Sequence, residues 1–197
     1  MLAKSTLLIE ANFRAPSIAA VLSMRNIADG STWKSIAPNL ALSEVNQSSA
    51  DQLESFMNKA TDEFEFIIID IGSVSGLSNR LTDRRWTSVV TTWCCDQADE
   101  LMIVSRADHL GHYRLTQVIE LLQQTSIRAQ LSFTQNMKSS GKRGDAQMAR
   151  FLTATTPLKP SRIRSLKEEI RSVMAAEDEH ATLVETCLLY TSPSPRD

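Results

Sequence analysis

The sequence predicts an α/β fold, a mostly parallel sheet with flanking helices. Three short apolar runs carry this prediction: Thr6–Glu10, Phe66–Asp70 and Glu100–Ser105. Continuous apolar runs of this length are typical of strands buried on both faces, as in parallel sheets. Leu110–Gln124 between the third and fourth strands has an apolar stripe at helical spacing. Strands that alternate with helices favour parallel pairing through right-handed crossovers.

The remaining elements follow from local patterns, and Phe66–Asp70 is expected to be the central strand. In chain order, we expect a helix over Ile18–Met24, a mixed segment over Asn26–Asn46 with a short helix near Trp33–Ile36, a helix over Ser49–Thr61, a loop over Gly72–Thr82, a helix over Asp83–Asp96, a fourth strand over Arg128–Thr134, a basic loop over Ser139–Gly144, and helices over Asp145–Leu152 and Ser165–Ala176.

Size and composition fit one cytoplasmic domain with a real core. The chain has 197 residues and a formal net charge of −2, which gives no electrostatic argument for binding nucleic acid. The sequence contains no apolar run long enough to cross a bilayer, and its start lacks a signal-peptide layout. The adjacent Cys94 and Cys95 are expected to be small core residues.

Asp70 is the first polar residue after its apolar run, and Gly72 follows closely. Open α/β sheets bind their ligands at the carboxyl ends of the strands. A carboxylate there can hold a nucleotide-bound Mg²⁺ directly or through water, while a glycine allows a close turn. The alternative is that Asp70 only caps a loop by accepting backbone N–H groups.

Other chemical motifs are absent or weak. The sequence has no G-x-x-x-x-G-K-[ST] phosphate loop, and the nearest match, Ser140–Arg143, follows the wrong strand. His109 and His112 could share a metal, but no acid is placed to complete the site, so we interpret them as surface residues. No serine occupies a nucleophile elbow.

Four segments together resemble the MinD/ParA family of P-loop ATPases. Leu7–Ser17 resembles the family's "LLIDADxRxPS" segment, and Ile67–Gly72 is similar to its Walker B strand. Ala98–Gly111 resembles "ADxxxxVxxxDxxG". Asn136 ends the fourth strand, where the family carries an Asn that reads adenine.

Order and spacing agree with the family from Thr6 to about Leu152. Arg84–Ser88, before the third strand, looks most like the CpaE-like branch. Members of that branch act in pilus assembly, secretion and positioning at the cell pole or septum. The resemblance therefore implies a cytoplasmic switch protein, with a homodimeric parent and protein partners. It is compatible with a position at the pole or with peripheral contact at the inner membrane surface.

The resemblance also implies ATP and Mg²⁺ as ligands and assigns roles to single residues. Asp70 would hold the Mg²⁺ shell. Glu10, Gly72 and Asn136 would contact the nucleotide with it. Asn12 stands where the family has the Asp that positions the attacking water, and is the candidate catalytic residue. An Asn can orient a water but cannot accept a proton.

The sequence departs from the family pattern in three places. The phosphate loop would precede Thr6, so we expect an incomplete P-loop NTPase fold that is inactive by itself. Glu10 and Asn12 replace the paired Asp residues, and Ile71-Gly72 replaces the Pro that often follows the Walker B acid. The expected domains are a partial ATPase-like domain over 1–154, a helical extension over 155–186, and a non-native tail over 187–197 that resembles a translated sequencing adapter.

Three functional hypotheses stay open. The first is an ATP-binding switch, and the second is a non-catalytic localisation scaffold with the same fold. In the second, Glu10 and Asn12 would only cap the following helix, and Asn136 would be a turn residue. The third is a bacterial tyrosine kinase, which is disfavoured because those kinases carry a C-terminal tyrosine cluster and only Tyr113 and Tyr190 are present.

Overall fold

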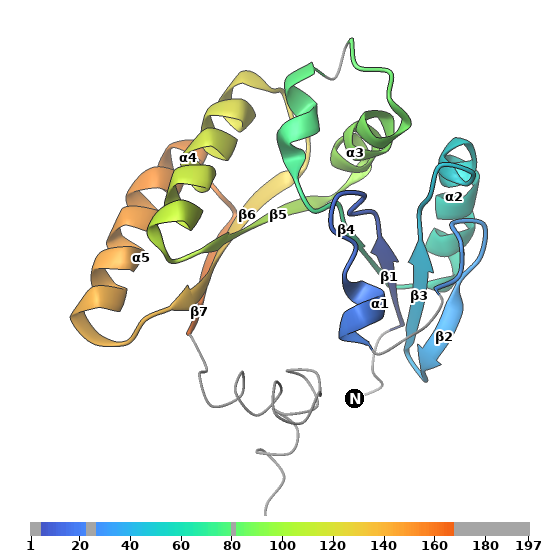
Figure 1. Cartoon of the computed structure of the whole chain (residues 1–197), viewed down its shortest axis with the longest axis horizontal. Coiled ribbons are helices and arrows are strands. Elements are labelled where there is room, and N and C mark those ends of the chain that lie inside the picture. The colour runs from blue at the N-terminus through green and yellow to red at the C-terminus, as the bar shows by residue number, and fades with distance from the viewer. Residues whose placement is uncertain (1–4, 23–26, 80–81, 168–197) are drawn as a thin grey trace, which may run out of the picture. The chain divides into compact units, whose positions relative to one another are not determined.

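The computed structural model describes residues 5–22, 27–79 and 82–167. The chain divides into two compact units, residues 1–99 with 120–129 and residues 100–119 with 130–197. Each unit is built on its own sheet, and nearly all strand pairs are parallel (Figure 1). The predicted α/β class with a mostly parallel sheet and flanking helices is confirmed.

The first unit holds a four-stranded sheet in the order β2-β3-β1-β4. β1 is parallel to both of its neighbours, and among the described strands of this sheet the β2–β3 pair alone is antiparallel. The elements of this unit are β1 (Thr6–Glu10), α1 (Ile18–Val21), β2 (Lys34–Ala37), β3 (Leu40–Glu44), η1 (Ala50–Gln52), α2 (Leu53–Glu63), β4 (Phe66–Asp70), η2 (Val74–Asn79) and α3 (Trp86–Gln97).

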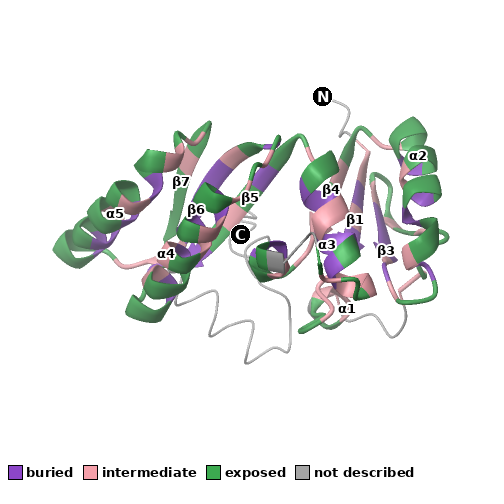
Figure 2. Ribbon diagram, turned by 90° about the horizontal axis from the view of Figure 1, so that it is seen from above, coloured by how far each residue is buried: buried purple, intermediate pink, exposed green. Residues whose placement is uncertain are grey.

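The main hydrophobic cluster of this unit includes the face of the sheet that carries Leu7 and Ile9, and Leu42 on the opposite face is fully buried as well. Leu7 and Ile9 of β1 are fully buried, and Leu53, Phe56 and Ala60 at helical spacing on α2 join the same cluster. The buried residues on β1 and β3 are visible in purple in Figure 2. Val90 and Cys94 of α3 and three partly buried tryptophans (Trp33, Trp86, Trp93) complete the cluster.

The second unit holds the parallel sheet β5-β6-β7. Its strands are β5 (Glu100–Arg106), β6 (Gln130–Lys138) and β7 (Arg162–Lys167), joined by α4 (His109–Gln124), α5 (Gly141–Thr155) and η3 (Thr156–Leu158). Figure 1 shows α4 and α5 on the same side of this sheet. The amide of Gln135 on β6 donates to the backbone carbonyl of Gln147 on α5 at 3.1 Å, and Phe133 of β6 and Phe151 of α5 are buried.

The prediction of β4 as a central strand buried on both faces is wrong. β4 ends the strand order of its sheet, and Phe66 and Ile68 are 49% and 55% exposed. Ile67 and Ile69 point to the other face and pack against the core. An uninterrupted apolar run reports a tendency to be buried, whereas the number of neighbouring strands decides whether both faces are covered.

Three further local predictions are corrected. The short helix near Trp33–Ile36 is replaced by the β2–β3 hairpin, in which Ala41 and Leu42 are buried beside β1. The predicted helix from Ser165 is replaced at its start by β7, because Arg162–Lys167 pairs with β6, and its other residues lie outside the described ones. α5 begins at Gly141, inside the predicted basic loop. In each case pairing or packing with a distant segment outweighs local pattern.

No helix among the described residues is long and apolar enough to cross a membrane.

Cys94 and Cys95 are buried in α3 as free thiols, in agreement with their prediction as core residues. Burial raises the pKa of Cys94 to about 12 and that of Cys95 to about 11. The reactive thiolate is therefore scarce at neutral pH in the folded state.

We expect both thiols to resist iodoacetamide at pH 8 in a Cys187→Ser variant, and to react readily once urea unfolds the chain. Mass spectrometry after timed quenching measures the two rates. The unfolded thiols ionise near their ordinary pKa of 9.0, so the folded state should also lose stability as pH rises from about 9 toward 11. Rapid labelling without urea would contradict the buried placement.

Candidate functional site

Three acidic residues end neighbouring strands at one edge of the four-stranded sheet. Glu10 of β1 is in register with Glu44 of β3 on one side and with Asp70 of β4 on the other. Residues in register on parallel strands point to the same face of the sheet. Backbone bonds extend the pairing past the strand ends, from Val45 N to Glu10 O at 2.9 Å and from Ala11 N to Asp70 O at 2.8 Å. The carboxyl ends of the strands, where these acids lie, are where open α/β sheets bind ligands.

Glu10 holds the loop and helix that follow β1. Its side chain is 2% exposed, and its carboxylate accepts three backbone N–H groups. Oε2 accepts from Ser17 and Ile18 at 2.8 Å each, and Oε1 accepts from Asn12 at 3.1 Å. A carboxylate at the start of α1 satisfies N–H groups that have no partner inside the helix. The geometry therefore gives Glu10 the capping role that the sequence left open.

Asn12 and Gly72 bring the loops after β1 and β4 together. Gly72 has φ +65°, and a Cβ built on it would lie 2.3 Å from Cγ of Asn12. A side chain at position 72 would thus displace the amide of Asn12, and the left-handed φ favours glycine at this position. Asn12 is fixed by Ala15, whose N–H donates to Oδ1 at 3.2 Å.

Asp70 is half-buried beside this contact. Its Oδ1 accepts the Gly72 N–H at 2.8 Å, and no partner for Oδ2 is found among the described residues. No group of three His, Cys, Asp or Glu side chains is placed to hold a metal in the described part of the chain. Mg²⁺ commonly uses one or two carboxylates with waters and substrate phosphates, so a single free carboxylate oxygen fits that ion.

A cavity of about 190 Å³ adjoins the acidic strand ends. Its lining residues include Glu10, Asn12, Glu44 and Trp86. Phe13 stacks edge-on against Trp86 with ring centroids 4.5 Å apart, which forms an aromatic wall. Pockets that enclose drug-sized ligands are usually about 300–1,000 Å³. The cavity therefore suits a small group or a few waters.

Asn136 belongs to the second unit and lies within β6, in register with Arg106 of β5. Its Oδ1 accepts the N–H of Met137 at 2.8 Å, and Met137 has a left-handed φ of 58°. Glu10, Asn12 and Asp70 belong to the first unit. The Asn136 side chain supports an irregularity inside β6, where the register with β7 shifts between Gln135 and Lys138, and not a turn at the end of the strand.

Asp108 and Gly111, two residues of the family-like segment Ala98–Gly111, have structural roles at the start of α4. Asp108 Oδ1 accepts the Gly111 N–H at 2.7 Å at the start of α4. This bond, with the guanidinium of Arg106, holds the pKa of Asp108 below its usual range. A Cβ on Gly111 would lie 2.2 Å from the carbonyl oxygen of Arg106, which explains the glycine.

Glu44 is the strand-end residue that the sequence analysis missed. The run Leu40–Glu44 ends in an acid just as Phe66–Asp70 does. It was hidden because it is short and lies in a stretch with many Ser and Asn residues. The first polar residue after the apolar run Leu40–Leu42 is Ser43, so the criterion that selected Asp70 does not select Glu44.

The sequence matches no protein-family model, and no curated protein matches it significantly. Solved structures do resemble the fold. A ParA family ATPase from Chlorobium tepidum TLS superposes with a TM-score of 0.68 at 12% identity, covering 94% of this chain and 79% of that chain. A candidate plasmid partition protein from Borrelia burgdorferi B31, bound to AMPPNP, gives a TM-score of 0.57 at 12% identity, covering 95% of this chain and 87% of that one. A further Borrelia burgdorferi plasmid partition protein gives 0.51 at 13% identity, covering 95% and 86%. At these identities the likeness concerns the fold: the chain has the α/β fold of ParA-family ATPases.

Proposed function

We propose that this chain is part of a MinD/ParA-like switch protein that binds ATP with Mg²⁺. The observation that supports the proposal most directly is Asp70, which ends β4 with one carboxylate oxygen free at the ligand-binding edge of a parallel sheet. The fold likeness adds support, since one of the similar structures was solved with AMPPNP. In the finer proposal, the protein is CpaE-like, dimeric, and positions a pilus, secretion or septum machine.

The residues at this edge would divide the work. Asp70 would hold the Mg²⁺ shell through Oδ2, and the ion would neutralise phosphate charge. Asn12 would orient a water with its amide, and the contact with Gly72 fixes where that amide lies. Because an amide cannot take up a proton, we expect slow hydrolysis at most. Asn136 would offer its Nδ2 to the base, since its Oδ1 already accepts the Met137 N–H.

A localisation scaffold with the same fold is the second candidate. It is favoured by Glu10, whose carboxylate is occupied by three backbone N–H groups, and by the uncharged Asn12. A scaffold would keep these structural contacts and have no need of Mg²⁺. The two candidates differ in whether Asp70 contributes charge or only a hydrogen bond.

Asp70→Asn separates these roles because the Asn side chain keeps an oxygen for the Gly72 N–H and loses the charge. We expect the variant to melt like the parent and to lose about tenfold or more in Mg²⁺-dependent ATP affinity. Isothermal titration with ATP, with and without Mg²⁺, provides the measurement. Since the sequence has no phosphate-loop motif, the titration extends to millimolar ATP so that weak binding is also detected.

Equal Mg²⁺-dependent affinity in Asp70→Asn and the parent would reduce Asp70 to a loop cap. No binding at millimolar ATP would favour the scaffold. A turnover assay on a protein that does bind then decides whether Asn12 permits hydrolysis.

A further inference from the structure

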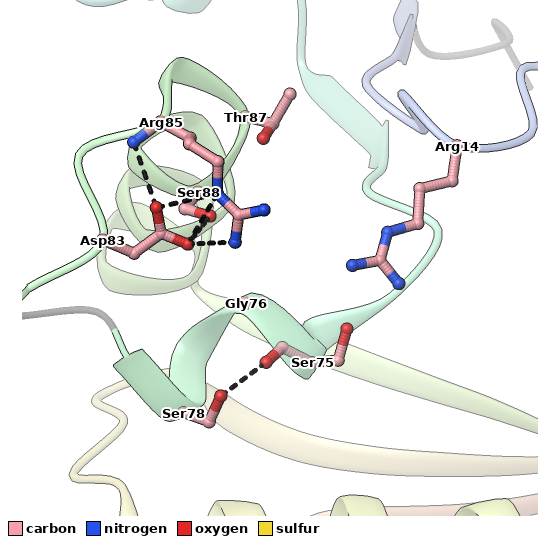
Figure 3. Close-up of a pocket in the computed structure, with 8 residues that line it drawn as sticks. All are labelled: Arg14, Ser75, Gly76, Ser78, Asp83, Arg85, Thr87 and Ser88. Atoms are coloured by element: carbon pink, nitrogen blue, oxygen red, sulfur yellow. Dashed lines mark hydrogen bonds and ion pairs between the residues drawn. The ribbon is translucent and has the colours of Figure 1, made fainter.

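The first unit contains a second, polar pocket of about 450 Å³ (Figure 3). Three separate segments supply its walls: the loop after β1, the η2 turn and the start of α3. The lining residues are Arg14, Ser75, Gly76, Ser78, Asp83, Arg85, Thr87 and Ser88. Asp70 is not among them, and apart from Gly76 all are charged or carry a hydroxyl group. Such a lining is suited to a polar ligand.

Asp83 is the one carboxylate among these lining residues, and its charge is already satisfied. The Nε of Arg85 donates to its two oxygens at 2.9 and 3.1 Å, and the Ser88 hydroxyl donates to Oδ2 at 2.7 Å. The N–H of Arg85 also donates to Oδ1. These bonds hold the pKa of Asp83 well below its usual range. The carboxylate therefore orients Arg85 and stays charged at any ordinary pH.

Arg14 gives the pocket an uncompensated positive charge. No hydrogen bond or ion pair of its guanidinium is found among the described residues, and Figure 3 shows it across the pocket from Arg85. Two guanidinium groups therefore face one satisfied carboxylate. Guanidinium groups match the oxygens of phosphate and carboxylate with paired N–H donors.

Neutral donors complete the walls. α3 has 12 residues, and its N-cap residue Arg85 makes no side-chain cap. The N–H groups of Ser88 and Val89 donate to the Arg85 carbonyl, so those of Trp86 and Thr87 are left without an acceptor inside the helix. The Thr87 hydroxyl lies at this end of the helix, and the Ser75 hydroxyl, which accepts from Ser73 at 3.2 Å, keeps its own proton to donate. Charged and neutral donors from three segments thus converge on one space.

We propose that this pocket binds a phosphate group, either inorganic or carried by a small ester. Arg14 and Arg85 contact the phosphate oxygens, and Thr87 and Ser75 donate their hydroxyl protons. Asp83 positions Arg85 and does not touch the ligand. This site does not depend on the proposed nucleotide function, because none of its lining residues belongs to the acidic strand ends.

The test titrates the 197-residue chain with inorganic phosphate at constant ionic strength, with chloride as the balancing anion. Tryptophan fluorescence is the readout, because Trp86 directly follows Arg85 in the sequence. We expect saturable binding, weakened about tenfold or more in Arg14→Ala and less in Arg14→Lys. Arg128→Ala is the matched control, since Arg128 is also an exposed arginine of the first unit and lies outside the pocket.

A second titration uses glycerol 3-phosphate. Whichever of glycerol 3-phosphate and inorganic phosphate binds more tightly shows whether the site takes an ester or the free ion. If Arg14→Ala and Arg128→Ala weaken phosphate binding equally, or if the fluorescence change never saturates, phosphate acts by general charge screening, as an adventitious ion only. Either result would overturn the proposal. Asp70→Asn should bind phosphate like the parent. Loss of phosphate binding in that variant would contradict the claim that the phosphate site is separate from the nucleotide site. Loss of ATP binding alone would leave the proposed phosphate site unaffected.

Discussion

Replacing Glu10 by Ala is expected to lower the free energy of unfolding of the first unit by about 3 kcal/mol. The substitution leaves three backbone N–H groups, those of Asn12, Ser17 and Ile18, without their carboxylate acceptor. Buried donors that lose a charged acceptor carry the cost of desolvation without compensation. The loop after β1 and the short helix α1 should therefore detach first.

Urea unfolding followed by tryptophan fluorescence measures this effect selectively. All three tryptophans of the chain lie in the first unit and pack against its core cluster. Glu44→Ala is the matched control, because Glu44 ends the neighbouring strand and no hydrogen bond of its carboxylate is found among the described residues. We expect it to change stability by less than about 0.5 kcal/mol. A loss as large as that of Glu10→Ala would contradict the capping role.

The 197-residue chain is expected to self-associate at tens of micromolar concentrations. β4 and β5 each end the strand order of their own sheet and carry exposed apolar side chains there. Phe66 and Ile68 share one face of β4, while Met102 and Val104 share one face of β5, with Val104 60% exposed. Edge strands with apolar surface recruit further copies of a chain by strand addition and burial.

Sedimentation velocity of the parent and of an Ile68→Lys/Val104→Lys double variant provides the measurement. Lysine on an edge strand opposes strand addition, because the charge would have to be buried in the contact. We expect the double variant to sediment as a single species and the parent as a mixture of sizes. Val89→Lys, which places the same charge on an exposed residue of α3, should leave association unchanged. A parent that is monodisperse and melts cooperatively would refute this expectation.

Much of the strand content was predictable from residues close together in the chain. Thr6–Glu10, Phe66–Asp70 and Glu100–Ser105 are strands, and the acid at position 70 ends its strand where the apolar run stops. Each run is long enough for local burial tendency to decide its conformation. The β2–β3 hairpin escaped prediction because its short runs become strands only through pairing with β1, whose residues are distant in sequence.

The candidate site was predictable in its members but not in their roles. Glu10, Asn12, Asp70 and Gly72 were singled out from the sequence, and the structure brings them to one edge of one sheet. Their roles depend on contacts between loops. Glu10 caps a helix and Asn12 lies against Gly72. Of these four residues, Asp70 is the one whose side chain keeps an oxygen without a partner in the described part of the chain. The pocket between Arg14 and Arg85 could not be predicted from the sequence, because its walls come from three separate segments.

The sequence by itself determined the α/β class, the main strands and the acid that ends β4, since periodicity and apolar runs are local properties of the chain. The tertiary structure alone decided that β4 is an edge strand and that the Glu10 carboxylate accepts hydrogen bonds from backbone N–H groups. It also placed two arginines around one polar pocket. The physical reason is that strand order, burial of a face and satisfaction of a charge depend on residues far apart in the chain, whose meeting no local pattern encodes.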